Sequence, residues 1–316
     1  MSLSLVLIAA PPAERGVVAF VPLKAEASVP ERFRLEAAEF HYELEGWQDA
    51  GLYTVERLRF PSPIVTPDEA NNTVHAEYFR PKSPGKHPGV VVLHILGADF
   101  PLSRYLAARL AERGVAALFV KLPYYGERRP VGGEQRLLSA NVDRSVLSMR
   151  QGVLDVRRAA TWLASRPDVE ASRLGVTGIS LGGIVSSLVA SVDPSIHRAA
   201  LVMAGGNLAE ALWSMPESRK VRELWISAGR TKAQLIEVMR PVDPLTTAAG
   251  LIGKRVVMFA GNADEVIPPD CTRVLWEAAG RPPIRWYDCG HYSVAGFLLP
   301  AIREVVDFFA DEPPSP

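Results

Sequence analysis

Short apolar runs, each bounded by glycine or proline, recur along the last two thirds of the chain. An apolar run of this length without polar alternation is typical of a strand buried on both faces, as in a parallel sheet. We therefore predict buried strands at residues 90–93, 115–120, 174–176 and 256–259, and a further strand at 284–287.

Helical patterns separate these runs. Residues 102–113 end at Gly114, a residue type that favours the helix C-cap. Within residues 153–163, apolar side chains spaced by three or four positions fall on one helical face, and the pattern stops before Pro167. Strands that alternate with helices predict right-handed crossovers. We therefore expect an α/β fold with a mainly parallel central sheet flanked by helices.

The first part of the chain has a different pattern. Apolar and polar residues alternate at residues 40–44, 53–55 and 74–78, which predicts strands, and the alternation changes phase before Leu58, which predicts an irregularity between strands. We assign residues 1–50 to an N-terminal extension that either extends the sheet, wraps the body or mediates dimer contacts. Residues 51–316 form the main domain, in which residues 207–253 are predicted to form a short lid.

Composition excludes several classes of function. The 316 residues include 35 Lys and Arg and 35 Asp and Glu, whereas nucleic-acid binding and polybasic membrane binding need clustered positive charge. The longest apolar runs, at residues 3–10 and 90–96, are shorter than the roughly 18 residues of a membrane-spanning helix. No basic residue precedes the first run and two prolines follow it, so we expect a cytoplasmic location. Cys271 and Cys289 are interpreted as independent buried thiols.

The strongest chemical signal is the segment Gly178-Ile179-Ser180-Leu181-Gly182, which lies between a predicted buried strand and an apolar helical pattern. A strand that turns this sharply into a helix leaves no room for side chains two residues either side of the serine, and it lifts the hydroxyl above the sheet edge. The new helix supplies unpaired N–H groups for developing negative charge. Ser180 is therefore the candidate nucleophile, and a glycine-rich turn that only packs a helix on a strand is the alternative.

A serine hydroxyl is a weak nucleophile and needs a base, usually a histidine oriented by a carboxylate. Asp264 follows the predicted strand at 256–259, and His291 follows the predicted strand at 284–287. A lone loop aspartate is more often a turn former and a lone loop histidine a surface residue. Neither alternative predicts the order Ser, Asp, His, which hydrolases with a nucleophile elbow use.

Three other acids compete with Asp264 for the role of orienting the histidine. Asp243 lies between two prolines, where a structural turn is expected. Glu265 is expected to point away from the direction of Asp264, and Asp288 is so close in sequence to His291 that it would have to fold back on its own loop. The carboxylate is therefore predicted to be that of Asp264.

A tetrahedral oxyanion needs two N–H donors, one from the residue after the nucleophile and one from the loop after an earlier strand. These two requirements predict that the backbone N–H groups of Leu181 and Leu96 form the oxyanion hole. His94, directly after the strand at 90–93, is expected to brace that loop by a hydrogen bond, and a second catalytic base is the alternative.

The chain from about residue 89 to 309 resembles the α/β-hydrolases, on the evidence of the Ser180 elbow, the Asp264 loop, the Gly290-His291 pair and the oxyanion loop. Residues 155–162 and 173–183 resemble the branch that is similar to dienelactone hydrolases and acetyl xylan esterases. Dienelactone hydrolases use a cysteine in the elbow, so Ser180 favours esters. The second position of the oxyanion motif is usually glycine, and here it is Ile95.

The resemblance implies hydrolysis of carboxylic esters through an acyl-serine intermediate, with no metal or organic cofactor. The predicted partner is a small-molecule ester, and a homo-oligomer is compatible with the sequence. An oligopeptidase-like peptidase and a catalytically silent binding protein are the alternatives. Tyr124, Tyr125 and Trp213 are candidate substrate-binding residues, although the tyrosines could simply anchor a solvated loop and the tryptophan could seal the lid. Bulky residues in residues 207–253 predict short acyl groups: Trp213, Met215 and Trp225.

Overall fold

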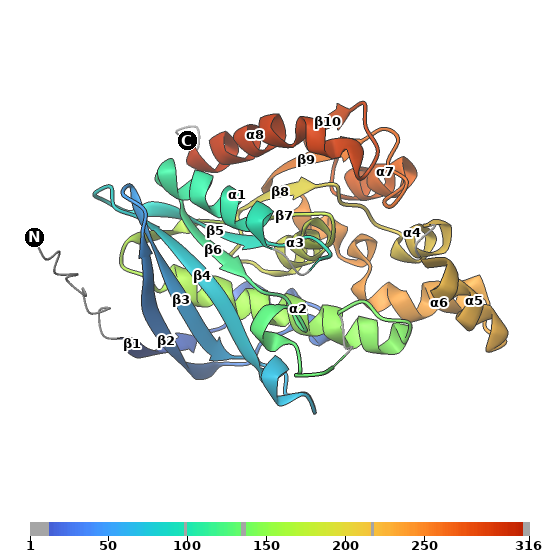
Figure 1. The fold of residues 1–316 in the computed structure, drawn as a ribbon, viewed down its shortest axis with the longest axis horizontal. Coiled ribbons are helices and arrows are strands. Elements are labelled where there is room, and N and C mark those ends of the chain that lie inside the picture. Colours follow the sequence, from blue (N-terminus) through green and yellow to red (C-terminus); the bar gives the residue numbers. More distant parts are fainter. Residues whose placement is uncertain (1–12, 98–99, 134–136, 216–217, 312–316) are drawn as a thin grey trace, which may run out of the picture.

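A single ten-stranded sheet runs through the structure, a computed structural model that describes residues 13–97, 100–133, 137–215 and 218–311 (Figure 1). In space the strands follow the order β1-β2-β3-β4-β6-β5-β7-β8-β9-β10. Their bounds are β1 Glu14–Phe20, β2 Ala38–Asp49, β3 Tyr53–Pro61, β4 Thr73–Pro81, β5 His87–Leu93, β6 Ala116–Val120, β7 Val169–Ile179, β8 Arg198–Val202, β9 Arg255–Gly261 and β10 Ile284–Tyr287.

Strands β5 to β10 pair in parallel, and β1 to β4 form an antiparallel meander that joins them through β6. Every residue of β5, β6 and β8 is buried, which explains their unbroken apolar runs. The predicted α/β fold with a mainly parallel sheet is thus confirmed. The carboxyl ends of the parallel strands meet at one edge of the sheet, and the candidate site lies there.

Eight α-helices connect and cover the strands within the described residues. The chain passes from β5 to β6 and then crosses back over β5 to reach β7, so right-handed crossovers place α1 and α2 on opposite faces. In Figure 1, α8 lies beside α1, and α3 lies with α2 on the other face. The bounds are α1 Pro101–Glu112, α2 Val142–Ala164, α3 Leu181–Val192, α4 Leu208–Ser214, α5 Arg219–Ser227, α6 Lys232–Met239, α7 Pro269–Ala278 and α8 Leu298–Ala310.

The N-terminal segment extends the sheet, one of the three alternatives left open by its sequence. β1 pairs with β2, and β2 pairs with β3. Glu26 lies in the connection between β1 and β2. Its carboxylate accepts hydrogen bonds of 2.6 and 2.9 Å from the buried guanidinium of Arg157 on α2, which also binds the carboxylate of Asp193 at 3.1 Å. This buried ion pair anchors the connection against α2. The apolar run at residues 3–10, on which the expected cytoplasmic location partly rests, lies outside the described residues.

The strand irregularity lies in β2, and not within β3 as the change of phase before Leu58 suggested. The β2–β3 register shifts between Gly46 and Gln48, so Trp47 is an extra residue in β2, while β3 runs unbroken. Val55 and Leu58 are nevertheless both buried. Their spacing of three places them on opposite faces of one strand, because successive side chains alternate.

Residues 207–253, which the sequence predicts to be a lid and which are called the lid segment below, form α4, α5, α6 and short 3-10 turns between β8 and β9 (Figure 1). Asp243 holds this segment together, because its carboxylate accepts hydrogen bonds from the backbone N–H groups of Asn207, Leu208 and Leu245. Both cysteines are buried and free. Among the helices of the described residues, none has the length and apolar character needed to cross a membrane.

Candidate active site

Ser180 occupies a sharp turn between β7 and α3. Its backbone has φ 55° and ψ −115°, a left-handed region that non-glycine residues rarely adopt. The neighbouring elements hold it there: the Ser180 N–H donates to the carbonyl of Val202 at 2.9 Å, and the Ser180 carbonyl accepts from the N–H of Ile184 at 2.9 Å. The turn thus presents the hydroxyl at the edge of the sheet.

The flanking glycines are required by close backbone approach, as predicted. A Cβ at Gly178 would lie 2.5 Å from the carbonyl carbon of Gly182, and a Cβ at Gly182 would lie 2.6 Å from the carbonyl oxygen of Leu93. Both contacts are with backbone, which cannot rotate away as a side chain can. The two glycines therefore permit β7, α3 and the end of β5 to meet beneath Ser180.

The structure brings Ser180, His291 and Asp264 into one hydrogen-bonded chain. Oγ of Ser180 lies 2.9 Å from Nε2 of His291, and Nδ1 of His291 lies 2.9 Å from Oδ2 of Asp264. A carboxylate next to Nδ1 selects the tautomer that carries the proton on Nδ1. Nε2 is then left as an acceptor for the serine hydroxyl, which is the arrangement that a general base needs.

Asp264 is itself held by the loop after β9. Its Oδ1 accepts hydrogen bonds from the N–H groups of Val266 at 2.8 Å and Ile267 at 2.7 Å, and its side chain is 3% exposed. These bonds aim the carboxylate at the imidazole. The competing acid Asp243 makes its hydrogen bonds within the lid segment and to α4 instead.

Glu265 supports the histidine loop, a role that its sequence position did not reveal. The side chain was expected to point away from Asp264, but its Oε2 accepts the backbone N–H of His291 at 2.8 Å. That hydrogen bond is the largest contribution to a lowered pKa of Glu265. Ser293 Oγ accepts the N–H of Gly290 at 2.8 Å on the same loop. Glu265 therefore fixes the backbone of His291 while Asp264 fixes its ring.

The predicted oxyanion donors, Leu181 and Leu96, both line the same cavity as Ser180. Leu181 is the first residue of α3, and N–H groups in a first helical turn have no intrahelical acceptor. Leu96 follows the peptide carbonyl of Ile95, which accepts a 2.7 Å hydrogen bond from Nδ1 of His94. In a trans peptide the C=O and the next N–H point in opposite directions, so the Leu96 N–H points away from His94.

His94 braces the oxyanion loop and is no second base. It is fully buried, and its Nε2 accepts the backbone N–H of Leu122 at 3.1 Å. The ring packs against Tyr125 and Phe100, with centroid separations of 4.4 and 5.0 Å. Burial lowers the pKa of His94 to about 4, which keeps the imidazole neutral.

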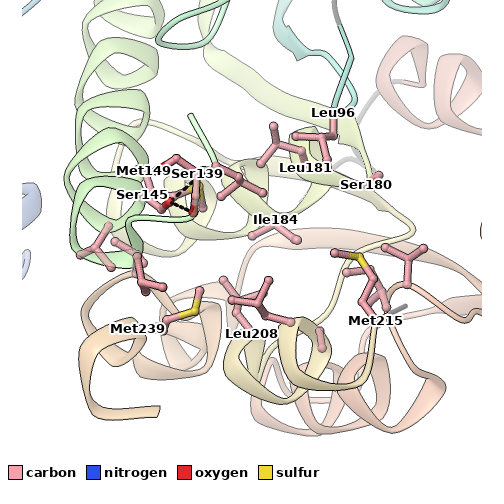
Figure 2. A pocket seen from close by; sticks show the side chains of 18 residues that line it. Leu96, Ser139, Ser145, Met149, Ser180, Leu181, Ile184, Leu208, Met215 and Met239 are labelled. Carbon is pink, nitrogen blue, oxygen red and sulfur yellow. Dashed lines mark hydrogen bonds between the residues drawn. The ribbon is translucent and has the colours of Figure 1, made fainter. Parts of the chain in front are cut away.

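An apolar cavity of about 120 Å³ opens beside Ser180 (Figure 2). Helix α2 and the lid segment supply most of its wall. The residues at this wall are Leu96, Leu138, Ser139, Val142, Ser145, Val146, Met149, Ser180, Leu181, Ile184, Leu208, Ala211, Leu212, Met215, Met239, Val242, Val266 and Ile267. Sequence reasoning identified only four of them, Ser180, Leu181, Leu96 and Met215. The other wall residues of α2 and α4 could have been found from their spacing. Positions 142, 145, 146 and 149, and again 208, 211, 212 and 215, are separated as i, i+3, i+4, i+7, which places each set on one helical face.

The three residues predicted to bind substrate lie outside this cavity wall. Tyr124 and Tyr125 are 5% exposed, because the N–H of Tyr124 donates to Oδ1 of buried Asn71 and the Tyr125 ring packs on His94. The loop-anchoring alternative is therefore the one that the structure supports. Trp213 packs elsewhere in the lid segment, where Lys232 lies over its ring. In the part of the chain that the structure describes, no group of three or more His, Cys, Asp or Glu is placed to hold a metal ion.

The model of the family "Alpha/beta hydrolase domain containing 18" matches residues 45–205, just over half of the chain. The chain belongs to this family. A second model, that of the prolyl oligopeptidase family, matches residues 149–279. The α/β-hydrolase resemblance inferred from the motifs is thus confirmed.

Curated relatives are longer than this chain. An uncharacterized protein of Mycobacterium tuberculosis is 31% identical over 232 residues, which are 70% of this chain and 53% of the relative. Mitochondrial acyl-coenzyme A thioesterase 2 of Mus musculus is 27% identical over 180 residues, which are 57% of this chain and 36% of the relative. The chain thus spans about half the length of the first of these relatives and about a third of the second.

Solved structures share the fold. An acetyl xylan esterase from Paenibacillus sp. R4 superposes with a TM-score of 0.69 at 20% identity and covers 90% of each chain. This likeness shows that the chain shares the α/β-hydrolase fold with that esterase.

Proposed function

We propose that the protein is a serine hydrolase that cleaves carboxylic esters with short acyl groups. Ser180 Oγ attacks the ester carbonyl while Nε2 of His291 takes its proton, and the Leu181 and Leu96 N–H groups bind the oxyanion. The tetrahedral intermediate collapses to an acyl-serine, and His291 returns the proton to the leaving alkoxide, which departs as the alcohol. Asp264 holds the imidazole tautomer and stabilises the imidazolium.

Water then completes the cycle with the same groups. His291 accepts a proton from water as the hydroxide adds to the acyl-serine carbonyl, and it returns that proton to Ser180 Oγ as the carboxylic acid leaves. The observation that carries the proposal is the hydrogen-bonded chain from Ser180 through His291 to Asp264, with 2.9 Å at each link. A catalytically silent fold has no need of the strained φ of 55° at Ser180.

The cavity supports an ester substrate over a peptide. Among the residues that the structure describes, its wall holds no charged side chain, and the side-chain hydroxyls there are those of three serines. A peptide would bring backbone N–H and C=O groups that need partners when buried. A hydrocarbon acyl chain has no such requirement.

The substitution Ser180→Ala tests the proposal. The variant should fold normally and lose nearly all activity on p-nitrophenyl acetate. Ser139→Ala is the matched control, because Ser139 lines the same cavity on the side away from Ser180, and it should retain most of the activity. Ser180→Ala turnover above a few per cent of the wild-type rate would contradict the assignment.

Short acyl groups are proposed because the cavity is small. In a site of fixed depth, each excluded methylene changes discrimination by about 1 to 3 kcal/mol. We expect a lower kcat/KM on a C8 ester than on a C2 ester, and the reverse order would overturn this part of the proposal. The thioesterase relatives make an acyl-coenzyme A thioester a second candidate substrate, which is tested directly by release of free thiol from butanoyl-coenzyme A.

A further inference from the structure

The cavity lies on the acyl side of the proposed reaction. In acyl transfer the leaving atom must contact the general acid, which here is Nε2 of His291. The cavity wall includes Ser180 and both oxyanion residues but does not include His291, although His291 is among the described residues. A group that fills the cavity is therefore the acyl chain and not the leaving group.

The leaving-group side is open. Tyr292, directly after the catalytic histidine, is 63% exposed. An apolar cavity on the acyl side and an exposed leaving-group side predict unequal selectivity. The cavity should select acyl chains by their shape. Alcohols or thiols of different size should be accepted as leaving groups, because they depart toward solvent.

The chemistry of the wall selects a plain hydrocarbon chain. Ser139 Oγ donates to the carbonyl of Asn141 at 2.9 Å, and Ser145 Oγ donates to the Ser139 or Asn141 carbonyl at 3.3 or 3.2 Å. The protons of both hydroxyls are thus committed to backbone. A hydroxylated or charged acyl group would lose its hydrogen bonds with water, and the described serines of the wall away from Ser180 offer it no free donor.

The volume limits the length of that chain. A 150 Å³ apolar cavity accommodates the six carbons of benzene, so about 120 Å³ accommodates about five carbons beyond the carbonyl. Figure 2 shows Ser180 and Leu181 at one end, with Met149 on α2 and Met239 at the end of α6 away from Ser180. The two methionines therefore close the end that an acyl chain reaches last. Unbranched thioether side chains adapt their shape to a neighbour more readily than branched ones.

We propose that this cavity is an acyl-selecting subsite for unbranched saturated chains of about four to six carbons, bounded by Met149 and Met239, and that the enzyme tolerates varied leaving groups. The inference rests on the proposed function. It adds the substrate class and the residues that set the length limit. Acetyl groups leave most of the cavity unfilled, so they are poorer substrates than pentanoyl groups.

The test measures kcat/KM for esters with acyl chains of two to ten carbons, each with a p-nitrophenol and an ethanol leaving group. Wild type should prefer pentanoate over acetate by about ten-fold, and octanoate should be poorer than acetate. Met239→Ala should move the optimum two or three carbons longer. Ala211→Leu fills the cavity from α4, and it should lower kcat/KM on pentanoate more than on acetate, which abolishes the pentanoate preference.

Met258→Ala is the matched control, because Met258 is a buried methionine that does not line the cavity. It should leave the chain-length profile unchanged even if it lowers stability. An optimum at acetate in wild type, or the same profile in Met239→Ala and Ala211→Leu as in wild type, would overturn the inference. A profile that changes shape with the leaving group would overturn it too. If no ester is hydrolysed and Ser180 is not labelled by a fluorophosphonate, the proposed function itself fails.

Discussion

Nδ1 of His291 lies 2.9 Å from Oδ2 of Asp264, and the same carboxylate accepts two backbone N–H groups through Oδ1. The carboxylate is therefore fixed by its own loop before it meets the imidazole. The backbone of His291 is held separately by Glu265 at 2.8 Å. Ring orientation and loop position thus depend on two adjacent acids with different tasks.

Asp264→Asn should lower kcat by about 10³ to 10⁴, because the amide selects the wrong imidazole tautomer. The amide oxygen still accepts the N–H groups of Val266 and Ile267, so the thermal midpoint should change little. Asp243→Asn, Glu265→Gln and Asp288→Asn are the controls, and each should cost far less in kcat on p-nitrophenyl acetate. A larger loss at any of them would transfer the role of triad acid to that residue.

Gly290→Ala should act through Glu265. A Cβ at Gly290 would lie 2.4 Å from Oε2 of Glu265, so the carboxylate must move and release the His291 N–H. We expect kcat to fall about ten-fold in both Gly290→Ala and Glu265→Ala, and the two losses should not add in the double variant, because both break one hydrogen bond. Additive losses would show that the glycine acts independently of Glu265.

Gly182→Ala should displace the end of β5 that carries the oxyanion loop. The new Cβ would lie 2.6 Å from the carbonyl oxygen of Leu93 and 2.8 Å from that of His94. We expect a loss of stability of about 1 to 3 kcal/mol and a fall in kcat of at least about 100-fold. Gly296→Ala is the control, since a Cβ there meets nothing within 4 Å. Full activity in a folded Gly182→Ala protein would contradict the elbow geometry.

His94 should make stability depend on pH. Its folded-state pKa is about 4 because of burial, against 6.5 in the unfolded chain. Between these values the unfolded chain binds a proton that the folded chain does not, so the free energy of unfolding falls as pH drops from 6.5 to 4, by up to ~3 kcal/mol. Above pH 6.5 His94 contributes no pH dependence.

Denaturant unfolding of wild type and His94→Gln at pH 7, 5.5 and 4 isolates this effect, because glutamine does not titrate. Burial also lowers the pKa of His75 to about 4, but His75 is present in both proteins and cancels in the difference. The free energy of unfolding should fall more steeply with decreasing pH in wild type than in His94→Gln. Equal pH dependence in the two proteins would show that His94 is not the group responsible.

The buried parallel strands and the grouping of Ser180, Asp264 and His291 at one sheet edge could be predicted because both follow from local patterns. Buried parallel strands leave short apolar runs, and their carboxyl ends share one sheet edge, so residues that follow three such runs meet in space. Ser180 directly follows β7, whereas Asp264 and His291 lie in the loops after β9 and the partly exposed β10. The partner of the N-terminal strands could not be predicted, since alternation at Phe40 and Tyr42 indicates a strand without naming its neighbour.

Side-chain direction in the loops and the lid segment was less predictable. Glu265 faces the His291 backbone because the loop after β9 turns at Asp264, and that turn depends on hydrogen bonds that sequence spacing does not encode. Trp213 was favoured for its size, but the cavity is lined by smaller residues on the other face of α4, among them Leu208 and Leu212. The helical spacing of these leucines, and not the size of the tryptophan, indicates which residues line the cavity.

The most direct test of the central claim is to trap the acyl-enzyme. Wild type is mixed with p-nitrophenyl pentanoate, quenched with acid within milliseconds, digested and analysed by mass spectrometry. The account predicts a pentanoyl adduct on the peptide that contains Ser180, and none on that peptide in Ser180→Ala. Ester turnover with no adduct on Ser180, or an adduct on another residue that persists in Ser180→Ala, would contradict it.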